Sequence, residues 1–426
     1  MHGTANRTGL TRRGFLGGSS ALCGLSCIGG ATSPDVRVWR PGELKLHFIH
    51  TGAAESTFMV FPDGTSALLD CGGYPAINRG RLAVPVLPDG SRHSGEWIAR
   101  YVLKANPKGP DVDYMLVSHF HADHAGMPGW CRGHAPAAAG SYALSGFAEA
   151  AQWLHFKVAI DRGWPDYRDP MPSIANPDVL GLMKLLYAHL KRRDGLTVEK
   201  IRLGDDAQIV PRHGGCEGFS VRTVCANGRI AMKDGSTRDV FGPHAGRCTT
   251  PPENAMSIGH VLKYGGFTFF TAGDFCDVFR EKGRYVCFDD DLADAVGHAD
   301  VAKVNHHGCD SMSRKLVAAL SPRVWTAGVW DQLHMSPTTM GLLSDRAIYP
   351  GDRMIAPGVF TADRRLSDAG RPWMGDIAEE TFGGAHVVVS VPPGGREYTV
   401  AFLDAGDEAA IVKGEYRFRS GTGERI

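Results

Sequence analysis

The sequence lacks several features that mark large classes of protein. Lys plus Arg and Asp plus Glu are equal at 46 each, so the 426 residues carry no excess charge of one sign. Because nucleic acid is a polyanion, this balance does not favour a protein that stays bound to duplex DNA. The sequence also contains no internal repeat, no low-complexity tract and no Cys-x-x-Cys pair. A zinc ribbon or a thioredoxin-type redox site is therefore not expected.

The residues that are present suit a globular protein. Hydrophobic residues make up 43% of the chain and charged residues 22%. A chain of this length and composition can bury one large core or two of ordinary size. The apolar run that follows Phe15 is short and interrupted by glycines, so no stable membrane-spanning helix is expected there.

The N-terminal stretch "TRRGFLGGSSALCGLSCIGGATSPD" resembles a twin-arginine export signal, with Arg12 and Arg13 ahead of a mildly apolar run. We expect cleavage near Ala31, loss of residues 1–33, and a periplasmic or extracellular mature protein. The alternatives are a disordered tail or a membrane anchor. A lipoprotein anchor at Cys27 is a further but weaker possibility, because Leu25 is one residue too close to Cys27 for the usual spacing. Removing 1–33 leaves 43 basic and 46 acidic residues.

Apolar patterns predict strands and a helix in the first third of the chain. "ELKLHFIHTGAAESTFMVFPDGTSALLDCGG" predicts three strands, the last two joined at Asp63-Gly64, a dipeptide suited to a type I′ turn. Residues 96–104 have apolar residues at helical spacing, and "DYMLVSH" predicts a short buried strand. This strand, helix, strand order predicts an α/β sandwich with its chemistry at strand ends.

Residues 141–195 are expected to form an inserted helical segment. A first helix is predicted from one apolar stripe, formed by Phe147, Ala151, Leu154 and Val158. A second helix begins with Asn176 as N-cap and Pro177 in the first turn, and it ends at Gly195. Further along, "MSIGHVLKYGGFTFFTAGD" and "HVVVSVPPGGREYTVAFLD" each predict a hairpin, so the C-terminal part is expected to be mostly β.

The stretch "SHFHADHAGM", residues 118–127, places three histidines and an aspartate in six positions. In an extended segment His119 and His121 point the same way and can hold one ion. A turn after them lets Asp123 and His124 bind an ion at a neighbouring position. Such a string is expected by chance in roughly one of several hundred chains of this composition. A metal site is therefore a better explanation than a polar loop.

Three further polar residues end apolar strands, namely Asp70 after "SALL", Asp274 after "FTFFTAG" and His306 after "VAKVN". Acids and imidazoles gathered at strand ends destabilise a core unless something neutralises them. A pair of divalent cations does so. Imidazole and carboxylate ligands suit zinc, and manganese and iron remain open.

In this order, "LLDCGG", "SHFHADHAG", "TAGD" and "KVNHHG" resemble the ligand motifs of the metallo-β-lactamase fold. More narrowly, residues 43–130 and 251–340 are similar to the metallo-β-lactamase-like domain of ComEC competence proteins. The resemblance implies a four-layer αββα sandwich over residues 34–426, with two metals at one edge of its sheets. It leaves a helical insertion, about 131–200, and a β-rich extension, about 345–426, without a counterpart.

The resemblance also implies the metal ligands. They are His119 and His121 for the first metal, Asp123, His124 and His306 for the second, and Asp274 for both. Asp70 matches an acid that orients a ligand. The usual third-motif histidine is hard to place, since Asn254 aligns near it and His244 is the alternative. Asp123 is expected to orient the attacking water. His307 and His334 resemble positions that face substrate, where either one stabilises charge or protonates a leaving oxygen.

Three functions fit these residues. The first is a dinuclear phosphodiester hydrolase, in which two ions lower the pKa of a shared water to about 7. Its substrate is a small or oligomeric phosphodiester. Single-stranded nucleic acid is a further possibility that the net charge does not support. The second is a lactonase, β-lactamase or thioester hydrolase on the same fold. The third is a catalytically silent metal-binding envelope protein, against which the presence of Asp123 argues.

Overall fold

The chain divides into two compact units, Met1–Asp35 and Val36–Ile426. Asp35 is the only described residue of the first unit, so the predicted export signal and Cys27 lie outside the described residues, as does His244. The computed structural model describes residues 35–52, 54–74, 77–78, 81–82, 84–137, 140–169, 176–241, 252–276, 280–281, 284–285, 288–309 and 311–426.

The second unit contains a nine-stranded mixed sheet in the order β10-β9-β6-β3-β2-β1-β21-β22-β23. Strands β3, β6, β9 and β10 run parallel to one another, whereas the pairs from β3 through β2, β1, β21 and β22 to β23 are antiparallel. The strands are β1 (Leu44–Phe48), β2 (Thr57–Val60), β3 (Ser66–Leu69), β6 (Asp111–Leu116), β9 (His155–Asp161), β10 (Thr197–Lys200), β21 (Ala385–Val391), β22 (Glu397–Asp404) and β23 (Val412–Arg419).

A second sheet has eight strands in the order β13-β12-β11-β14-β15-β18-β19-β20. From β15 to β20 its strands are parallel, so their carboxyl ends lie at one edge. They are β11 (Phe219–Ala226), β12 (Arg229–Ala231), β13 (Thr237–Asp239), β14 (Gly259–Tyr264), β15 (Phe267–Thr271), β18 (Val301–Lys303), β19 (Val324–Thr326) and β20 (Met354–Ala356). The short pairs are β4 (Ile77–Asn78) with β5 (Arg81–Leu82), β7 (His134–Ala137) with β8 (Gly140–Ala143), and β16 (Arg280–Glu281) with β17 (Arg284–Tyr285).

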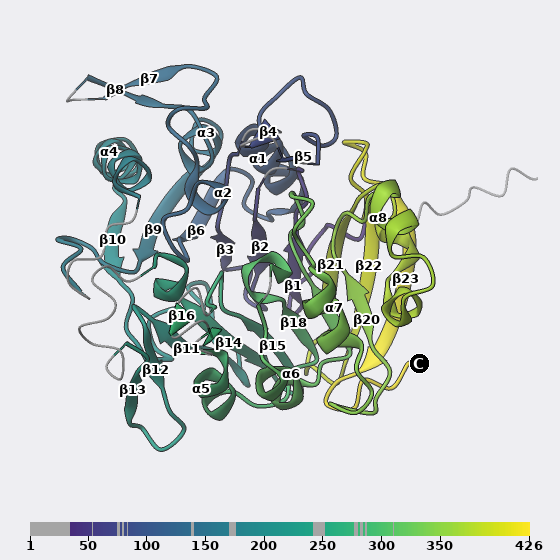
Figure 1. Ribbon diagram of the computed structural model, residues 1–426. Coiled ribbons are helices and arrows are strands. Elements are labelled where there is room, and N and C mark those ends of the chain that lie inside the picture. The colour runs from purple at the N-terminus through teal and green to yellow at the C-terminus, as the bar shows by residue number, and fades with distance from the viewer. Residues whose placement is uncertain are drawn as a thin grey trace, which may run out of the picture. The chain divides into compact units, whose positions relative to one another are not determined.

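Helices cover the outer face of each sheet, which confirms the predicted four-layer αββα sandwich (Figure 1). α1, α3 and α4 lie on the first sheet, and α5, α6 and α7 on the second. The helices are α1 (Ser94–Ala105), α2 (Ala122–Ala125), α3 (Phe147–Ala150), α4 (Pro177–Asp194), α5 (Phe288–Ala295), α6 (Arg314–Leu320), α7 (Pro337–Ser344) and α8 (Ala362–Ser367), with 3-10 turns η2 (Asn254–Met256), η3 (Asn305–Gly308), η4 (Pro372–Asp376) and η5 (Glu379–Thr381). Among the described residues, no helix combines the length and apolar composition needed to cross a membrane.

Strands buried on both faces explain the continuous apolar runs. In β15, Phe269 packs into the core between the sheets, whereas its neighbour Phe270 packs under the outer helices. Successive side chains of a strand point to opposite faces, so both faces must be apolar when both are covered. Leu46 of β1 and Val389 of β21 lie in the same inter-sheet core as Phe269. The C-terminal extension therefore completes the first sheet beside β1.

The prediction of a helix from the stripe Phe147 to Val158 is wrong. That stripe spans the short helix α3, a turn and the strand β9, which pairs in parallel with β6. Exposed and buried residues alternate at the start of β9, as expected for a strand with one face buried and the other exposed to solvent. Pairing with β6, a contact distant in the chain, decides the structure here.

Other local predictions hold. α1 covers the predicted helix at 96–104. α4 begins at Pro177 and ends at Asp194, and Gly195 follows as a C-cap in the left-handed conformation. Both predicted hairpins form, as β14 with β15 and β21 with β22. β2 and β3 also pair, but through the five residues 61–65, so the two-residue type I′ turn is wrong. The Asp63 carboxylate instead accepts hydrogen bonds from Thr65 within a longer loop.

Candidate metal centre

The strand-end residues of both sheets meet at one edge of the sandwich. Asp70 follows β3, and Asp274 lies three residues beyond β15. The loop after β6 carries the histidine cluster and leads into α2, and η3 follows β18. These elements lie at the carboxyl ends of parallel strands, where loops from several strands converge.

Side chains from these loops form two groups, each compact enough to hold an ion. One group contains Asp123, His124, Asp274 and His307, and the other contains His119, His121 and Asp274. In both, one ligand atom from each residue lies within 4.8 Å of the others. Asp274 belongs to both groups. Five of the six predicted ligands therefore lie together in these two groups.

The exception is His306, which was predicted to complete the second group and is replaced there by His307. Nε2 of His307 lies 3.0 Å from Oδ2 of Asp123 and 3.3 Å from Oδ2 of Asp274. The ring of His306 turns instead to the amide of Asn254, 3.1 Å away, and to Sγ of Cys276, 3.3 Å away. Both histidines have left-handed backbones, with φ of 47° and 52°, so the strand alternation that favoured His306 does not continue through η3.

Three of these imidazoles, those of His119, His124 and His307, have a hydrogen-bond partner at Nδ1, which leaves Nε2 as the atom that can bind a metal. His119 Nδ1 lies 3.0 Å from Ser118 Oγ, and His307 Nδ1–H donates to the carbonyl of Gly328 at 2.9 Å. His124 Nδ1–H donates to Asp70 at 2.7 Å. A proton on Nδ1 leaves Nε2 free to bind a cation, and such partners orient metal-bound histidines in many proteins. Asp70 thus lies where an acid that orients a ligand is expected.

Asp70 also fixes the loop that carries the histidines. Its carboxylate accepts hydrogen bonds from the backbone N–H and the hydroxyl of Ser118. Beyond it the chain runs against α2, and Cys71 N–H donates to the carbonyl of His124. A Cβ at Gly72 would lie 1.7 Å from the carbonyl oxygen of Asp123, so this approach requires glycine.

The centre concentrates buried negative charge. Burial alone lowers the pKa of His124, but nearby carboxylates, led by Asp274 and Asp123, outweigh burial and raise it to about 10. The pKa of His307 is likewise raised well above its usual value, mainly by Asp274. In the absence of an ion these two imidazoles therefore take up protons to neutralise the acids. A divalent cation can supply the same neutralisation, with both rings neutral.

Three residues of the centre were not predicted. Trp330 donates from Nε1 to Oδ2 of Asp123 at 3.1 Å, which orients that carboxylate. Glu55 places Oε2 at 3.3 Å from Nδ1 of His307 and 3.8 Å from Nζ of Lys303. Although burial raises the pKa of Glu55, Lys303 and His307 bring it down to about 2. Trp330 and Glu55 lie outside the ligand motifs, and Lys303 begins the motif "KVNHHG" without being one of its expected ligands, so the spatial contacts identify all three.

His334 lies against the second group without joining it. Its ring stacks on His307 with centroids 4.5 Å apart. Its Nδ1 atom accepts hydrogen bonds from the backbone N–H groups of Trp330, at 3.2 Å, and Asp331, at 3.3 Å. Burial, followed by the charge of His307, lowers the pKa of His334 well below its usual value. The ring is therefore neutral near pH 7, with its proton on Nε2.

Residues 50–184 match the family model of the metallo-beta-lactamase superfamily. This segment includes Asp70 and the whole histidine cluster, whereas Asp274, His307 and His334 lie beyond it. The match supports the superfamily resemblance drawn from the motifs and does not extend to the narrower ComEC type. A search of curated proteins gives no match. With the buried Asp and His groups, the superfamily match supports a metal-dependent hydrolase.

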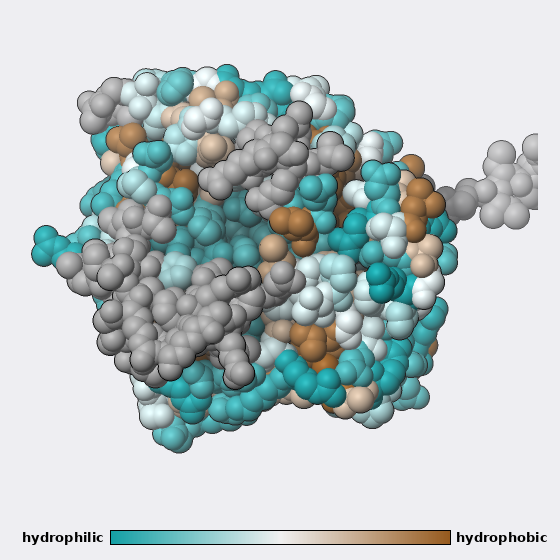
Figure 2. Space-filling model, viewed as in Figure 1, coloured by the Kyte–Doolittle hydropathy of each residue, from teal (hydrophilic) through white to brown (hydrophobic). Residues whose placement is uncertain are grey.

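A cleft of about 710 Å³ opens onto the two groups of candidate ligands. Figure 2 shows a hollow with a hydrophilic floor between the two helix layers. The walls come from the loop after α2, the first residues of α4, and the segment that carries Trp330 and His334. His306 and Cys309 also face this cleft. The insertion thus contributes one wall, through α4.

Proposed function

We propose that this protein is a dinuclear metallohydrolase that cleaves phosphodiesters. The observation that carries the proposal is the shared position of Asp274, whose Oδ2 atom lies 3.8 Å from His119 Nε2, 3.2 Å from His124 Nε2 and 3.3 Å from His307 Nε2. One carboxylate can therefore serve both groups. Two divalent cations, when bound, supply an activated water and neutralise charge on a phosphoryl group during in-line displacement.

The donor atoms fit such cations. His119, His121 and Asp274 would hold the first cation. The second would be held by Asp123, His124, His307 and, in common with the first, Asp274. Oδ1 of Asp274 is buried without a hydrogen-bond partner, and the same is true of Oδ1 of Asn254 beside His306. Imidazole and carboxylate together favour zinc, with manganese or iron as alternatives.

The protein's own residues orient the reaction. Trp330 holds Asp123 in one position, so its carboxylate can accept a hydrogen bond from the attacking water. His334 carries its proton on Nε2 and lines the cleft, so it can donate to a leaving oxygen. His307, also expected to face substrate, takes the position of a ligand instead. Asp70 keeps the Nε2 atom of His124 directed at the centre.

The choice of phosphodiesters over carbonyl substrates rests on the sequence similarity to the ComEC type. The cleft favours a small substrate over a nucleic acid strand, because none of the described residues that line it is Lys or Arg. A strand held along its backbone needs several such cations.

The test combines metal analysis with a substrate panel on the purified full chain. We expect two metal ions per chain, and hydrolysis of bis(4-nitrophenyl) phosphate that a chelator abolishes and zinc or manganese restores. His307→Gln should lower kcat/KM at least 100-fold and leave one tightly bound ion. His298→Gln, which changes an exposed histidine outside the centre, is the matched control. Faster hydrolysis of nitrocefin or a lactone would overturn the phosphodiester assignment, and metal binding with no hydrolysis would favour a silent protein.

We also propose export by the twin-arginine route, on the strength of Arg12, Arg13 and the run that follows them. The double substitution of Arg12 and Arg13 by Lys should retain the protein in the cytoplasm. N-terminal sequencing of the exported protein should begin near residue 32. An unprocessed N-terminus in the exported fraction would contradict cleavage at this position.

A further inference from the structure

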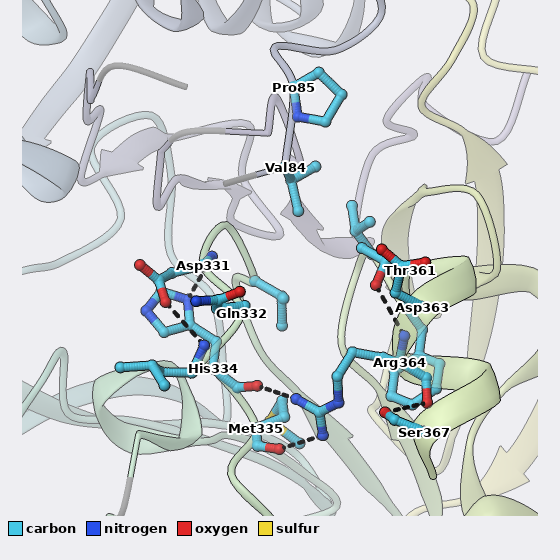
Figure 3. Close-up of a pocket in the computed structure, with 14 residues that line it drawn as sticks. Val84, Pro85, Asp331, Gln332, His334, Met335, Thr361, Asp363, Arg364 and Ser367 are labelled. Atoms are coloured by element: carbon cyan, nitrogen blue, oxygen red, sulfur yellow. Dashed lines mark hydrogen bonds between the residues drawn. The ribbon is translucent and has the colours of Figure 1, made fainter. Parts of the chain in front are cut away.

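A second pocket of about 590 Å³ lies beside the metal centre. Figure 3 shows its three walls. Val84 and Pro85 form one, the segment from Asp331 to Met335 forms another, and α8 with the residues just before it forms the third. Volumes of this order are typical of small-molecule sites. The third wall belongs to the C-terminal extension, outside the superfamily match.

His334 connects this pocket to the metal centre. It lines both the pocket and the cleft, and its ring stacks on His307. The backbone beneath it also serves both sides, since Gly328 binds His307 while the next residue, Val329, lines the pocket. When a substrate is bound at the two metal groups, the part of it that faces His334 therefore lies next to this pocket.

The pocket presents a mostly apolar surface, and the described residues that line it carry no positive charge that is left unpaired. Its apolar residues include Val84, Val329, Leu333, Val359 and Phe360. The cation among the described lining residues is Arg364, whose guanidinium bonds the Asp368 carboxylate at 2.9 Å and the carbonyls of His334 and Met335 at 2.8 Å each. The carboxylates of Asp331 and Asp363 also line the pocket. An anionic group is therefore disfavoured here, whereas an apolar one can be buried.

The structure also shows that the pocket is preorganised. Thr361 caps α8 by accepting a hydrogen bond from the N–H of Arg364. Arg364 then ties α8 to the two residues that follow the turn at Asp331 (Figure 3). Trp373 donates to Asp368 and so supports the same ion pair. A wall held by this many bonds needs little reorganisation when a ligand enters.

We propose that this pocket binds the organic part of one of the two phosphate ester groups of the substrate. The pocket selects an apolar group without negative charge. The substrate class is then a phosphodiester in which at least one ester group is an apolar, uncharged alkyl or aryl group, and not a polyphosphate or a nucleic acid strand. The proposal rests on the proposed function, because it assumes that the phosphoryl group lies at the two metal groups. The C-terminal extension, which forms one wall of the pocket, then determines substrate specificity.

The test uses phosphonates as probes, since each carries one substituent and is not hydrolysed. Inhibition constants are measured against bis(4-nitrophenyl) phosphate, and binding is measured directly by calorimetry on the metal-loaded protein. Butylphosphonate should bind about ten- to fifty-fold more tightly than methylphosphonate, because each buried CH₂ contributes up to about fourfold. 4-Isopropylphenylphosphonate should bind at least tenfold more tightly than 4-carboxyphenylphosphonate, which has nearly the same shape and an added charge.

Two variants locate the effect. Ser367→Tyr fills the pocket and should weaken butylphosphonate about tenfold while leaving methylphosphonate unchanged. Asp363→Lys supplies a cation and should shift the preference between the two aryl phosphonates at least fivefold toward the carboxylate. Asp352→Lys makes the same charge change at a side chain that is 85% exposed and outside the lining, and it should shift neither preference.

The outcomes separate the two proposals. If no phosphodiester is hydrolysed under any metal condition, the proposed function fails. If phosphodiesters are hydrolysed but butylphosphonate and methylphosphonate bind equally, the pocket assignment fails alone. It also fails if Asp352→Lys shifts the aryl preference as much as Asp363→Lys does. Should Ser367→Tyr not fold, Asp363→Lys by itself decides.

Discussion

The buried ion pair between Arg162 and Glu253 is expected to support both the fold and the histidine loop. Arg162 follows β9 of the first sheet, and Glu253 precedes η2, which leads into β14 of the second sheet, so the pair joins segments of the two sheets. Nε donates to Oε1 and Nη2 donates to Oε2, each at 2.7 Å, and both side chains are 1% exposed. Oε1 also accepts the backbone N–H of Phe120, the residue between His119 and His121.

Replacing Arg162 by Met leaves the Glu253 carboxylate buried with one remaining donor. Losing one partner of a buried pair typically costs about 3–5 kcal/mol. Since the N–H of Phe120 stays in place, we expect about 3 kcal/mol less stability for Arg162→Met in urea unfolding followed by tryptophan fluorescence. Zinc affinity should fall as well, because Glu253 positions the loop that carries His119.

The double variant Arg162→Met/Glu253→Gln is the internal control. It removes both charges yet keeps an oxygen acceptor for Phe120, so it should recover at least about 2 kcal/mol of the loss. Arg419→Met breaks an exposed pair with Glu424 and should cost under about 0.5 kcal/mol. The reasoning is refuted if Arg162→Met costs less than about 1 kcal/mol, or if the double variant is no more stable than the single one.

Three further predictions follow from single positions. Asp70→Asn removes the acid that orients its histidine partner and should weaken zinc binding about 10- to 100-fold in a chelator competition; an unchanged affinity would contradict this role. Gly72→Ala places a Cβ against the Asp123 carbonyl and should lower the bound metal toward one ion per chain, whereas Gly181→Ala, with open space around it, should leave metal content unchanged. Burial lowers the pKa of His260 from 6.5 to about 4, so the unfolded chain binds its proton more readily and stability falls as pH drops from 6.5 toward 4. His260→Leu should remove about 3 kcal/mol of that decline in urea unfolding, and an unchanged slope would refute it.

Local signals were enough to predict several elements. α4 was predicted at both ends, because proline favours a helix start and glycine at position 195 can adopt the left-handed C-cap that other residues avoid. The hairpins at residues 259–271 and 385–404 follow from turn residues between apolar runs. The histidine cluster was found because all its members lie within six positions. In each case the information is contained in neighbouring residues.

Local patterns failed where a distant contact outweighed them. β9 was predicted to be helical, since apolar spacing in so short a stretch fits either structure and pairing with β6 chooses the strand. The exchange of His306 for His307 has a similar cause. A left-handed turn after β18 directs two adjacent rings to different partners, and no pattern along the chain distinguishes them.

The sequence by itself determined the kind of chemistry, through the clustered imidazoles and the acids at strand ends, together with the α/β layers that carry them. Tertiary structure alone decided which histidine meets Asp274, which residues orient the ligands, and that α8 forms a pocket beside His334. The physical reason is that residue types and short spacings are written along the chain. Convergence of loops from two sheets depends on how the sheets pack, and that packing is set by the whole buried core.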